Sequence, residues 1–114
     1  MDPNCLFCKI ISGDIPSTEV YRDDSVIAFL DIAPVAAEHI LVIPLKHITF
    51  LRDSDDSDEA LIGHMALAAD RIALECGIQD SGYRLTINQG LDAGQEIDHL
   101  HMHLLGGRKL GRIG

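Results

Sequence analysis

The stretch Asp98-His99-Leu100-His101-Met102-His103-Leu104-Leu105 holds three of the six histidines of the chain, at every second position. Side chains alternate between the two faces of a β-strand, so this spacing predicts a strand with all three imidazoles on one face. Leu100, Met102 and Leu104 then lie on the opposite face, which we expect to pack against a core. Because histidine can act as a nucleophile, a proton donor or a metal ligand near neutral pH, the imidazole face is expected to line a reactive cleft.

Strand geometry limits what the three histidines can do together. His99 and His103 are about 13 Å apart at Cα along an extended strand, whereas nitrogens that share one zinc lie about 2.0–2.1 Å from it. These two side chains therefore cannot hold the same metal, and at least two roles are divided among the three histidines. The alternative is a histidine-rich surface tract such as a purification tag, but tags do not interleave histidine with Leu and Met.

Glycine-containing motifs flank this stretch on both sides: Gly94-Gln95 precedes it and Gly106-Gly107-Arg108 follows it. The histidine pattern resembles the signature of the histidine triad (HIT) family, and the flanks resemble the Hint branch of that family. The resemblance extends over nearly the whole chain. It includes the blocks Phe7-Cys8-Lys9-Ile10-Ile11, Phe29-Leu30-Asp31-Ile32-Ala33-Pro34, His39-Ile40-Leu41-Val42-Ile43-Pro44 and Gly82-Tyr83-Arg84-Leu85.

Length and charge restrict the class of protein. With 114 residues the chain has room for one domain, which we expect to be a single HIT domain over residues 1–114. Nine Lys and Arg against eighteen Asp and Glu give a net charge of −9, which opposes binding to nucleic acid polymers or anionic membranes. The start, Met1-Asp2-Pro3-Asn4, lacks the plan of a signal peptide, and no apolar run could span a bilayer. A soluble cytoplasmic protein is expected.

The cysteines indicate a reduced chain. Three cysteines in a cytoplasmic protein argue against a disulfide framework. Cys5 and Cys8 form a Cys-x-x-Cys motif, and from spacing alone this is half of a zinc site, a redox pair or two buried thiols. Cys76 is expected to be a small core residue.

The hydrophobic pattern predicts an α+β domain. The expected elements are a short helix over 5–12, a hairpin of strands 19–21 and 26–31, a buried strand over 39–43, a long helix over 59–76, a strand over 83–88, a loop over 89–97 and a last strand over 99–105. Asp56 and Glu59 have the spacing of a capping box for the long helix. Five strands with one long and one short helix predict a mainly antiparallel sheet. The family resemblance further implies a homodimer in which two such sheets form one of ten strands.

The resemblance also implies a catalytic mechanism. His101, the middle histidine, matches the nucleophile that attacks the α-phosphate and forms a covalent nucleotidyl-histidine. His103 is then the donor of a hydrogen bond to a phosphate oxygen or of a proton to the leaving group. His39 matches a further site histidine that supports the triad. From the residues alone, His101 could also be a solvent-facing strand histidine, and His64 is expected on the surface or at an interface.

A structural zinc ion is the cofactor that the resemblance implies. Zinc-bearing relatives combine the first histidine of the triad with a Cys-x-x-Cys and one more histidine. The matching ligands here are Cys5, Cys8, His47 and His99, a tetrahedral Cys2His2 set. The alternative is two reduced thiols and two ordinary histidines.

Nucleotide recognition is implied position by position. Asp31 matches the residue that accepts both ribose hydroxyls, although an Asp after a strand is usually a turn residue or a cap. Phe7, Ile10, Phe29 and Ile32 match the slot for the base, or are ordinary core. Asn88, Gly94 and Gln95 match the loop that contacts the phosphate. Glu96 stands where many Hint proteins have Ser, so the resemblance implies a role for its backbone N–H but not for its side chain.

These residues together predict a nucleotide hydrolase or nucleotidyl transferase that cleaves purine nucleoside 5′-phosphoramidates, of the adenosine 5′-phosphoramidate type. The expected ligands are purine nucleotides such as AMP, GMP or the phosphoramidate. A dinucleoside polyphosphate hydrolase is the alternative enzyme. A nucleotide-binding interaction or regulatory protein with incidental hydrolysis is the alternative of another class. The sequence ends soon after Gly111-Arg112, where relatives have a tail that shapes leaving-group preference, so the natural leaving group stays open.

Overall fold

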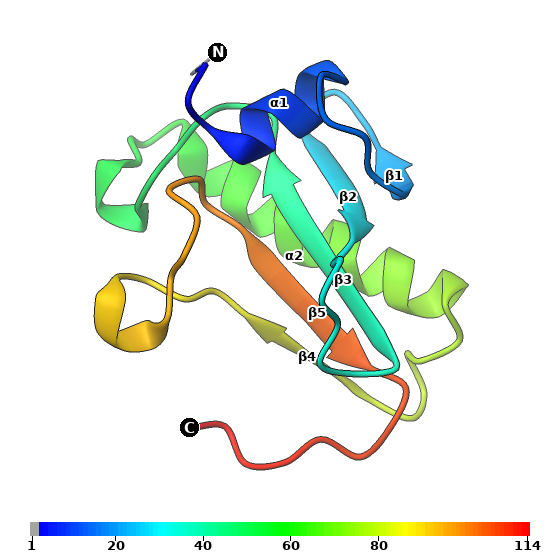
Figure 1. Cartoon of the computed structure of the whole chain (residues 1–114). Helices are drawn as coiled ribbons and strands as arrows, with labels where there is room; N and C mark the ends of the chain where they lie inside the picture. The colour runs from blue at the N-terminus through cyan, green and yellow to red at the C-terminus, as the bar shows by residue number, and fades with distance from the viewer. Residues whose placement is uncertain (1–2) are drawn as a thin grey trace.

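The computed structural model describes residues 3–114, so Met1 and Asp2, at the start of the segment examined for a signal peptide, lie outside the described residues. The elements are α1 (Leu6–Ser12), β1 (Glu19–Arg22), β2 (Val26–Leu30), β3 (Glu38–Pro44), the 3-10 turn η1 (Leu51–Asp53), α2 (Asp58–Glu75), β4 (Tyr83–Thr86), the 3-10 turn η2 (Leu91–Ala93) and β5 (Met102–Gly106). Five strands form one sheet in the order β1-β2-β3-β5-β4, and every neighbouring pair is antiparallel (Figure 1). The predicted α+β architecture is confirmed.

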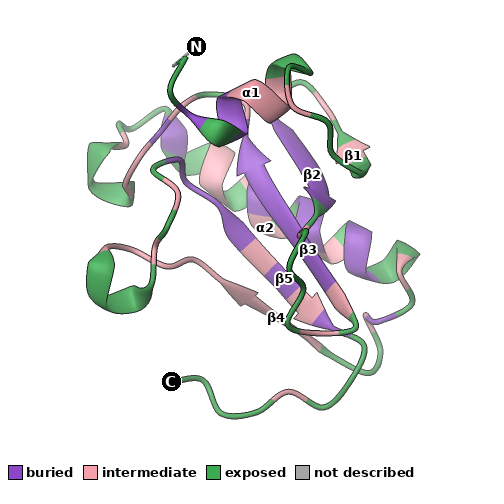
Figure 2. Cartoon of the chain, in the orientation of Figure 1, coloured by how far each residue is buried: buried purple, intermediate pink, exposed green. Residues whose placement is uncertain are grey.

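The two helices cover opposite faces of the sheet. Alternate residues of β3 point to different cores: Ile40 and Val42 pack with α2, whereas Leu41 and Ile43 pack with α1. Strand β3 is therefore buried on both faces over residues 39–44, and it is purple over nearly its whole length in Figure 2. This explains why residues 39–43 form an unbroken apolar run after the histidine instead of alternating with polar residues.

The last strand is shorter than expected at its start. Strand β5 begins at Met102, so His103 is in the strand while His99 and His101 lie in the segment that precedes it. Proline has no N–H for a sheet ladder, and the β3–β5 ladder ends before Pro44. Leu100 leaves the ladder and donates its N–H to the carbonyl of Ile48, with N and O 2.6 Å apart. The apolar side of the stretch is as predicted, because Leu100, Met102 and Leu104 all belong to the core under α2.

The start of α2 also differs from the expectation. The predicted capping box of Asp56 and Glu59 is wrong, because the helix begins at Asp58. The buried carboxylate of Asp58 accepts the N–H of Asp55 and a hydrogen bond from Lys46, at 3.0 and 2.7 Å. That ion pair gives the buried carboxylate of Asp58 a cationic partner, Lys46, at the surface. Strand β4 ends at Thr86 instead of Asn88, and apart from the start of β5, which is three residues late, the predicted ends are within two residues.

Within residues 3–114, none of the helices combines the length and the apolar character that a bilayer crossing requires. Cys76 is half-buried and lies against the core under α2, as predicted for a small core residue.

Candidate functional site

Two groups of ligand-type side chains lie on the α1 side of the sheet. The first group, here called the thiol–imidazole cluster, consists of Cys5, Cys8, His47 and His99. The second, here called the relay, consists of Asp31, His39 and His103. Within each group the potential ligand atoms all lie within 4.8 Å of one another. The separation of His99 from His103 into different groups agrees with the strand geometry.

The thiol–imidazole cluster has the spacing of a tetrahedral metal site. The Cys5 sulfur is 3.3 Å from Nδ1 of His99, and the Cys8 sulfur is 3.2 Å from Nδ1 of His47 and 3.7 Å from Nδ1 of His99. Sulfur and nitrogen on one tetrahedral zinc are about 3.5 Å apart, given bond lengths of about 2.3 and 2.0–2.1 Å. The four side chains can therefore hold a small cation with little movement.

Hydrogen bonds fix the tautomers of both histidines in this cluster. Nε2 of His99 is 2.9 Å from the carbonyl oxygen of Pro44, and an oxygen that can only accept requires the hydrogen to be on Nε2. Nε2 of His47 is 3.2 Å from the hydroxyl of Thr49, which itself donates to the carbonyl of Asp98. In both rings the lone pair is therefore on Nδ1 and points at the sulfurs, as metal coordination requires.

Burial favours the uncharged forms of Cys5 and His99 within the cluster. Desolvation raises the pKa of the Cys5 thiol, and it lowers the pKa of His99 to about 4. The N–H of Cys8 donates to the Cys5 sulfur at 3.3 Å, a contact that favours thiolate. The donor set of two cysteine sulfurs and two imidazoles fits zinc, which binds thiolate and imidazole ligands.

His101 lies between the two groups and is 6% exposed. Its Nδ1 is 2.7 Å from the carbonyl oxygen of His99, so Nδ1 carries the hydrogen and Nε2 carries the lone pair. The ring of Phe7 packs edge-on against it, with centroids 5.2 Å apart and planes at 83°. His101 is therefore held in one orientation, and the neutral tautomer that this hydrogen bond selects has its lone pair on Nε2.

Sheet register brings the relay together. Leu41 of β3 is directly opposite His103 of β5, so His39, two residues before Leu41, is the diagonal neighbour of His103 on the same face. Nε2 of His39 is 2.9 Å from Nδ1 of His103. Asp31 follows β2, and its N–H donates to the carbonyl of His39 at 3.0 Å, which holds its side chain beside His39.

A backbone group sets the direction of hydrogen bonding in the relay. The N–H of Val35 donates to Nδ1 of His39 at 3.1 Å, so the hydrogen of this neutral ring is on Nε2. Nε2–H of His39 then donates to Nδ1 of His103, and the remaining hydrogen of His103 is on its Nε2. Desolvation lowers the pKa of His39, and desolvation followed by repulsion from His101 lowers the pKa of His103 to about 4. Both rings are thus neutral at neutral pH.

The same hydrogen bonds make the relay a poor metal site. A cation would need the lone pair of His39 Nε2, and the hydrogen would have to move to Nδ1, where it would face the N–H of Val35. The two groups have similar spacing, but in the thiol–imidazole cluster both imidazole lone pairs face inward.

A mostly apolar cleft of about 380 Å³ lies beside these histidines. Six of the residues predicted to contact nucleotide line it: Phe7, Ile10, Phe29, Asp31, Ile32 and Glu96. Phe7 and Phe29 meet edge to face in its wall, with centroids 5.6 Å apart. Ile32 is fully exposed at the rim, where an apolar ligand could cover it. Leu6, Ile15, Leu41 and Ile97 also line the cleft and were not predicted, because their spacing is that of ordinary core residues.

Asn88, Gly94 and Gln95 of the predicted phosphate loop lie after β4 and do not line this cleft, whereas Glu96 of the same loop does. Gly94 has φ of 86°, a left-handed conformation that favours glycine. The side chain of Gln95 is used within the loop: its oxygen accepts the N–H of Gly90 at 2.8 Å, and its nitrogen donates to the carbonyls of Thr49 and Ile97. The backbone N–H of Gln95 also donates within the loop, to the carbonyl of Gly90 at 3.1 Å, so Gln95 shapes the loop. Asn88 is half-buried at the start of the same loop.

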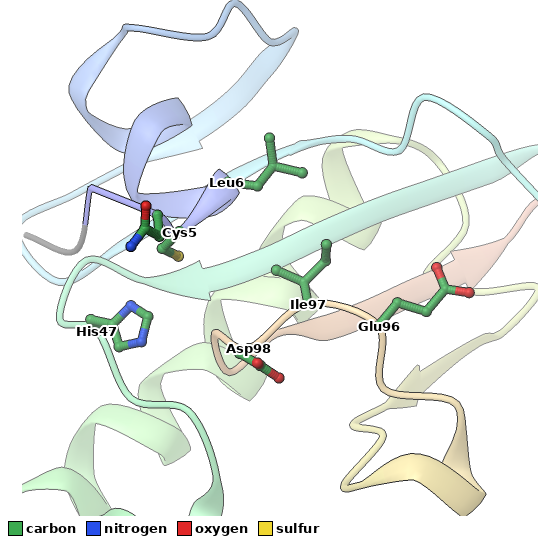
Figure 3. A pocket seen from close by; sticks show the side chains of 7 residues that line it. Cys5, Leu6, His47, Glu96, Ile97 and Asp98 are labelled. Carbon is green, nitrogen blue, oxygen red and sulfur yellow. The ribbon is translucent and has the colours of Figure 1, made fainter.

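A second hollow, of about 300 Å³, separates the cleft from the thiol–imidazole cluster. Figure 3 shows Cys5 and His47 on one side of it and Glu96 on the other, with Ile97 and Asp98 between. Glu96 lines both hollows. His64 lies apart from all of these groups, on α2, with Nε2 2.6 Å from the carboxylate of Asp23.

Comparison with known proteins agrees with this arrangement. The family model described as the HIT domain matches residues 12–110. The chain belongs to the HIT family. A HIT relative, purine nucleoside phosphoramidase from Escherichia coli K12, is 48% identical over 111 residues, which is 97% of this chain and 93% of that protein.

Solved HIT structures have the same fold. A histidine triad protein from Clostridium difficile superposes with a TM-score of 0.95 at 46% identity, covering 100% of this chain and 99% of that one. A zinc-bound histidine triad family protein from Mycobacterium smegmatis has a TM-score of 0.79 at 34% identity, covering 92% of this chain and 76% of that one.

Proposed function

We propose that this HIT protein hydrolyses purine nucleoside 5′-phosphoramidates, releasing an amine and a nucleoside monophosphate, and that the whole chain acts as one HIT domain. The observation that carries the proposal is the hydrogen bond from His101 Nδ1 to the carbonyl of His99, which leaves a fixed lone pair on Nε2. The name of the E. coli relative, a purine nucleoside phosphoramidase, supports the substrate class. The adenosine compound is our choice of substrate for the test.

The proposed reaction has two steps. Nε2 of His101 attacks the α-phosphorus, the P–N bond breaks, and its electron pair leaves with the amine nitrogen, which takes a proton from water. Water then attacks the phosphorus of the nucleotidyl-His101, the P–Nε2 bond breaks, and its electron pair returns to Nε2. The proton that the attacking water loses neutralises the hydroxide left by the first step. Splitting one difficult displacement into two is the usual advantage of a covalent route. His103, neutral at neutral pH, donates its Nε2–H to a phosphoryl oxygen and so stabilises charge in both steps.

Substrate recognition follows the cleft. Phe7, Ile10, Phe29 and Ile32 take the purine base, and Asp31 accepts the ribose hydroxyls at the end of the cleft nearest the relay. The loop with Asn88, Gly94, Gln95 and Glu96 takes the phosphate. Its donor is the backbone N–H of Glu96, because the N–H groups of Gly94 and Gln95 already donate to the carbonyls of Leu91 and Gly90.

The proposal includes one structural zinc ion held by Cys5, Cys8, His47 and His99. Its contribution when bound is to link the start of α1 to the segment before β5, and it takes no part in the chemistry. The proposal also includes a cytoplasmic location and a homodimer. Exposed Leu67 and Leu74 on α2, and the position of β4 at the sheet edge, support pairing with a second copy.

The test is turnover of adenosine 5′-phosphoramidate followed by rapid acid-free quenching and mass spectrometry. We expect amine release far above the spontaneous rate and one adenylyl group on the peptide that contains His101. Faster cleavage of a dinucleoside polyphosphate than of the phosphoramidate would favour that substrate class instead. Tight AMP binding without turnover of either compound would identify a nucleotide-binding regulatory protein.

A further inference from the structure

The two carboxylate oxygens of Asp31 have different neighbours. Oδ1 accepts the N–H of Ala33 at 2.8 Å, which fixes the rotation of the carboxylate. Oδ2 lies 3.4 Å from Nε2 of His39. The side chain of His39 is 5% exposed and that of Asp31 is 18% exposed, so this contact is largely shielded from water. Contact with ribose explains the exposed part of Asp31 but not its approach to His39.

The contact is made to the one N–H that orders the relay. Val35 requires the hydrogen of His39 to be on Nε2, and His39 donates this hydrogen to Nδ1 of His103 at 2.9 Å. Oδ2 of Asp31 lies 3.4 Å from the same nitrogen, which is an electrostatic contact and not a second hydrogen bond. A carboxylate only accepts, so it stabilises the Nε2–H form of His39 and opposes the other tautomer.

We propose that Asp31 is a positioning residue for His103: its carboxylate holds His39 in the Nε2–H form, and His39 in turn keeps the Nε2–H of His103 directed at the phosphate. This inference rests on the proposed function, because it assigns Asp31 a second task in the same site. Asp31 then connects the recognition of the ribose to the hydrogen-bond donor at the reacting phosphorus.

Replacement of Asp31 by Asn exposes this role. The amide oxygen can keep the bond from Ala33, which turns the NH2 group toward His39 Nε2–H, so two donors face each other. His39 must then rotate or change tautomer, and the other tautomer conflicts with Val35. The negative charge of Asp31 also raises the pKa of His39 and His103 against desolvation, and the Asn variant loses that effect.

The experiment compares wild type and Asp31→Asn on adenosine 5′-phosphoramidate and on its 2′,3′-dideoxy analogue, which has no hydroxyls for Asp31 to bind. On the dideoxy substrate we expect kcat to fall at least about tenfold with little change in KM, because a charge-assisted contact to the relay is lost. Asp80→Asn, at an exposed position outside the site, is the matched control and should leave both constants unchanged.

Two further measurements separate positioning from a general defect. In ¹⁵N spectra of the histidine rings, wild type should show the hydrogen of His39 and of His103 on Nε2, and Asp31→Asn should show a mixture. In a His39→Gln background the side-chain amide of the glutamine can donate to His103, and an amide has no second tautomer for Asp31 to oppose. Asp31→Asn should therefore lower kcat no further on the dideoxy substrate in that background.

An unchanged kcat on the dideoxy substrate, together with unchanged ring nitrogens, would overturn the inference and leave the proposed function intact. Equal loss of affinity for the ribose and dideoxy compounds would instead remove ribose recognition from the proposed function. The ring spectra still decide the inference in that case, because they need no substrate.

Discussion

The thiol–imidazole cluster and the relay look alike as lists of ligands but differ in where their hydrogens lie. In the cluster, His47 and His99 give their Nε2–H groups to oxygens outside it, and both lone pairs face the sulfurs. In the relay, Val35 supplies a backbone N–H from outside, so the hydrogen of His39 points inward at His103, and the carboxylate of Asp31 lies 3.4 Å from the same nitrogen. The first arrangement suits a cation and the second suits hydrogen-bond donation. The outer partner of each imidazole therefore decides its chemistry.

The largest effect should come from the side chain between these two groups. We expect His101→Ala to lower kcat by at least about 1,000-fold while nucleotide affinity stays within about tenfold, because the lost bond forms only along the reaction path. The measurement is steady-state amine release with isothermal titration of AMP. His64→Ala, on α2 and outside both groups, is the control. More than about a tenth of wild-type activity in His101→Ala would contradict the covalent route.

Removal of one sulfur tests the cluster without touching the relay. Cys8→Ser should lose at least about 2 kcal/mol of unfolding free energy, or about 8 °C in Tm, because metal binding contributes to folding. Differential scanning calorimetry measures the change, and Cys76→Ser is the matched control at a half-buried cysteine outside the cluster. Elemental analysis of wild type purified without chelator should give about one zinc per chain. A value below about 0.2, with full activity, would mean that the cysteines are only thiols.

The smallest expected effect is the pH dependence of stability that comes from His103. Burial, followed by repulsion from His101, lowers the pKa of His103 to about 4 from an ordinary value of 6.5. In the unfolded chain His103 is therefore protonated as the pH falls below about 6.5, whereas in the folded chain it is protonated only near pH 4. Stability contributed by neutral His103 is present above pH 6.5 and is lost as the pH falls through this window.

Thermal unfolding of wild type and His103→Gln between pH 4 and 7 measures this linkage. The variant has one titrating group fewer, so its Tm should depend less steeply on pH. Identical slopes in the two proteins would mean that His103 takes up its proton equally in the folded and unfolded chains.

The sequence was sufficient for the architecture because the histidine stretch alternates with the period of a strand, and the unbroken apolar run at 39–43 is too short for a helix and is bounded by Pro44. The α+β sheet and the HIT family are confirmed on that basis. The grouping of Cys5, Cys8, His47 and His99 within one cluster is confirmed as well, whereas their occupancy by zinc stays a prediction. The roles of His101, Asp31 and the base-slot residues also stay predictions.

Four features could not be foreseen from the residues alone. The start of β5 depends on where Pro44 ends the ladder of another strand, and the start of α2 depends on a pairing between Asp58 and Lys46. The internal use of Gln95 depends in part on the carbonyl of Thr49, which lies 46 positions away in the sequence. The direction of hydrogen bonding in the relay depends on the backbone N–H of Val35, and the valine side chain gives no indication of this role in the sequence. Each is a tertiary contact made by groups that local patterns do not distinguish.

Strand β3 has a partner on both sides and apolar packing on both faces, whereas the loop after β4 is fastened mainly through the side chain of Gln95. Amide hydrogen exchange should therefore be slowest along β3 and much faster in the loop, since local opening costs least where few buried contacts are lost. Opening of this loop breaks none of the ladder hydrogen bonds of β3, the strand that carries His39. A local fluctuation at one rim of the site therefore leaves the arrangement of the histidines intact.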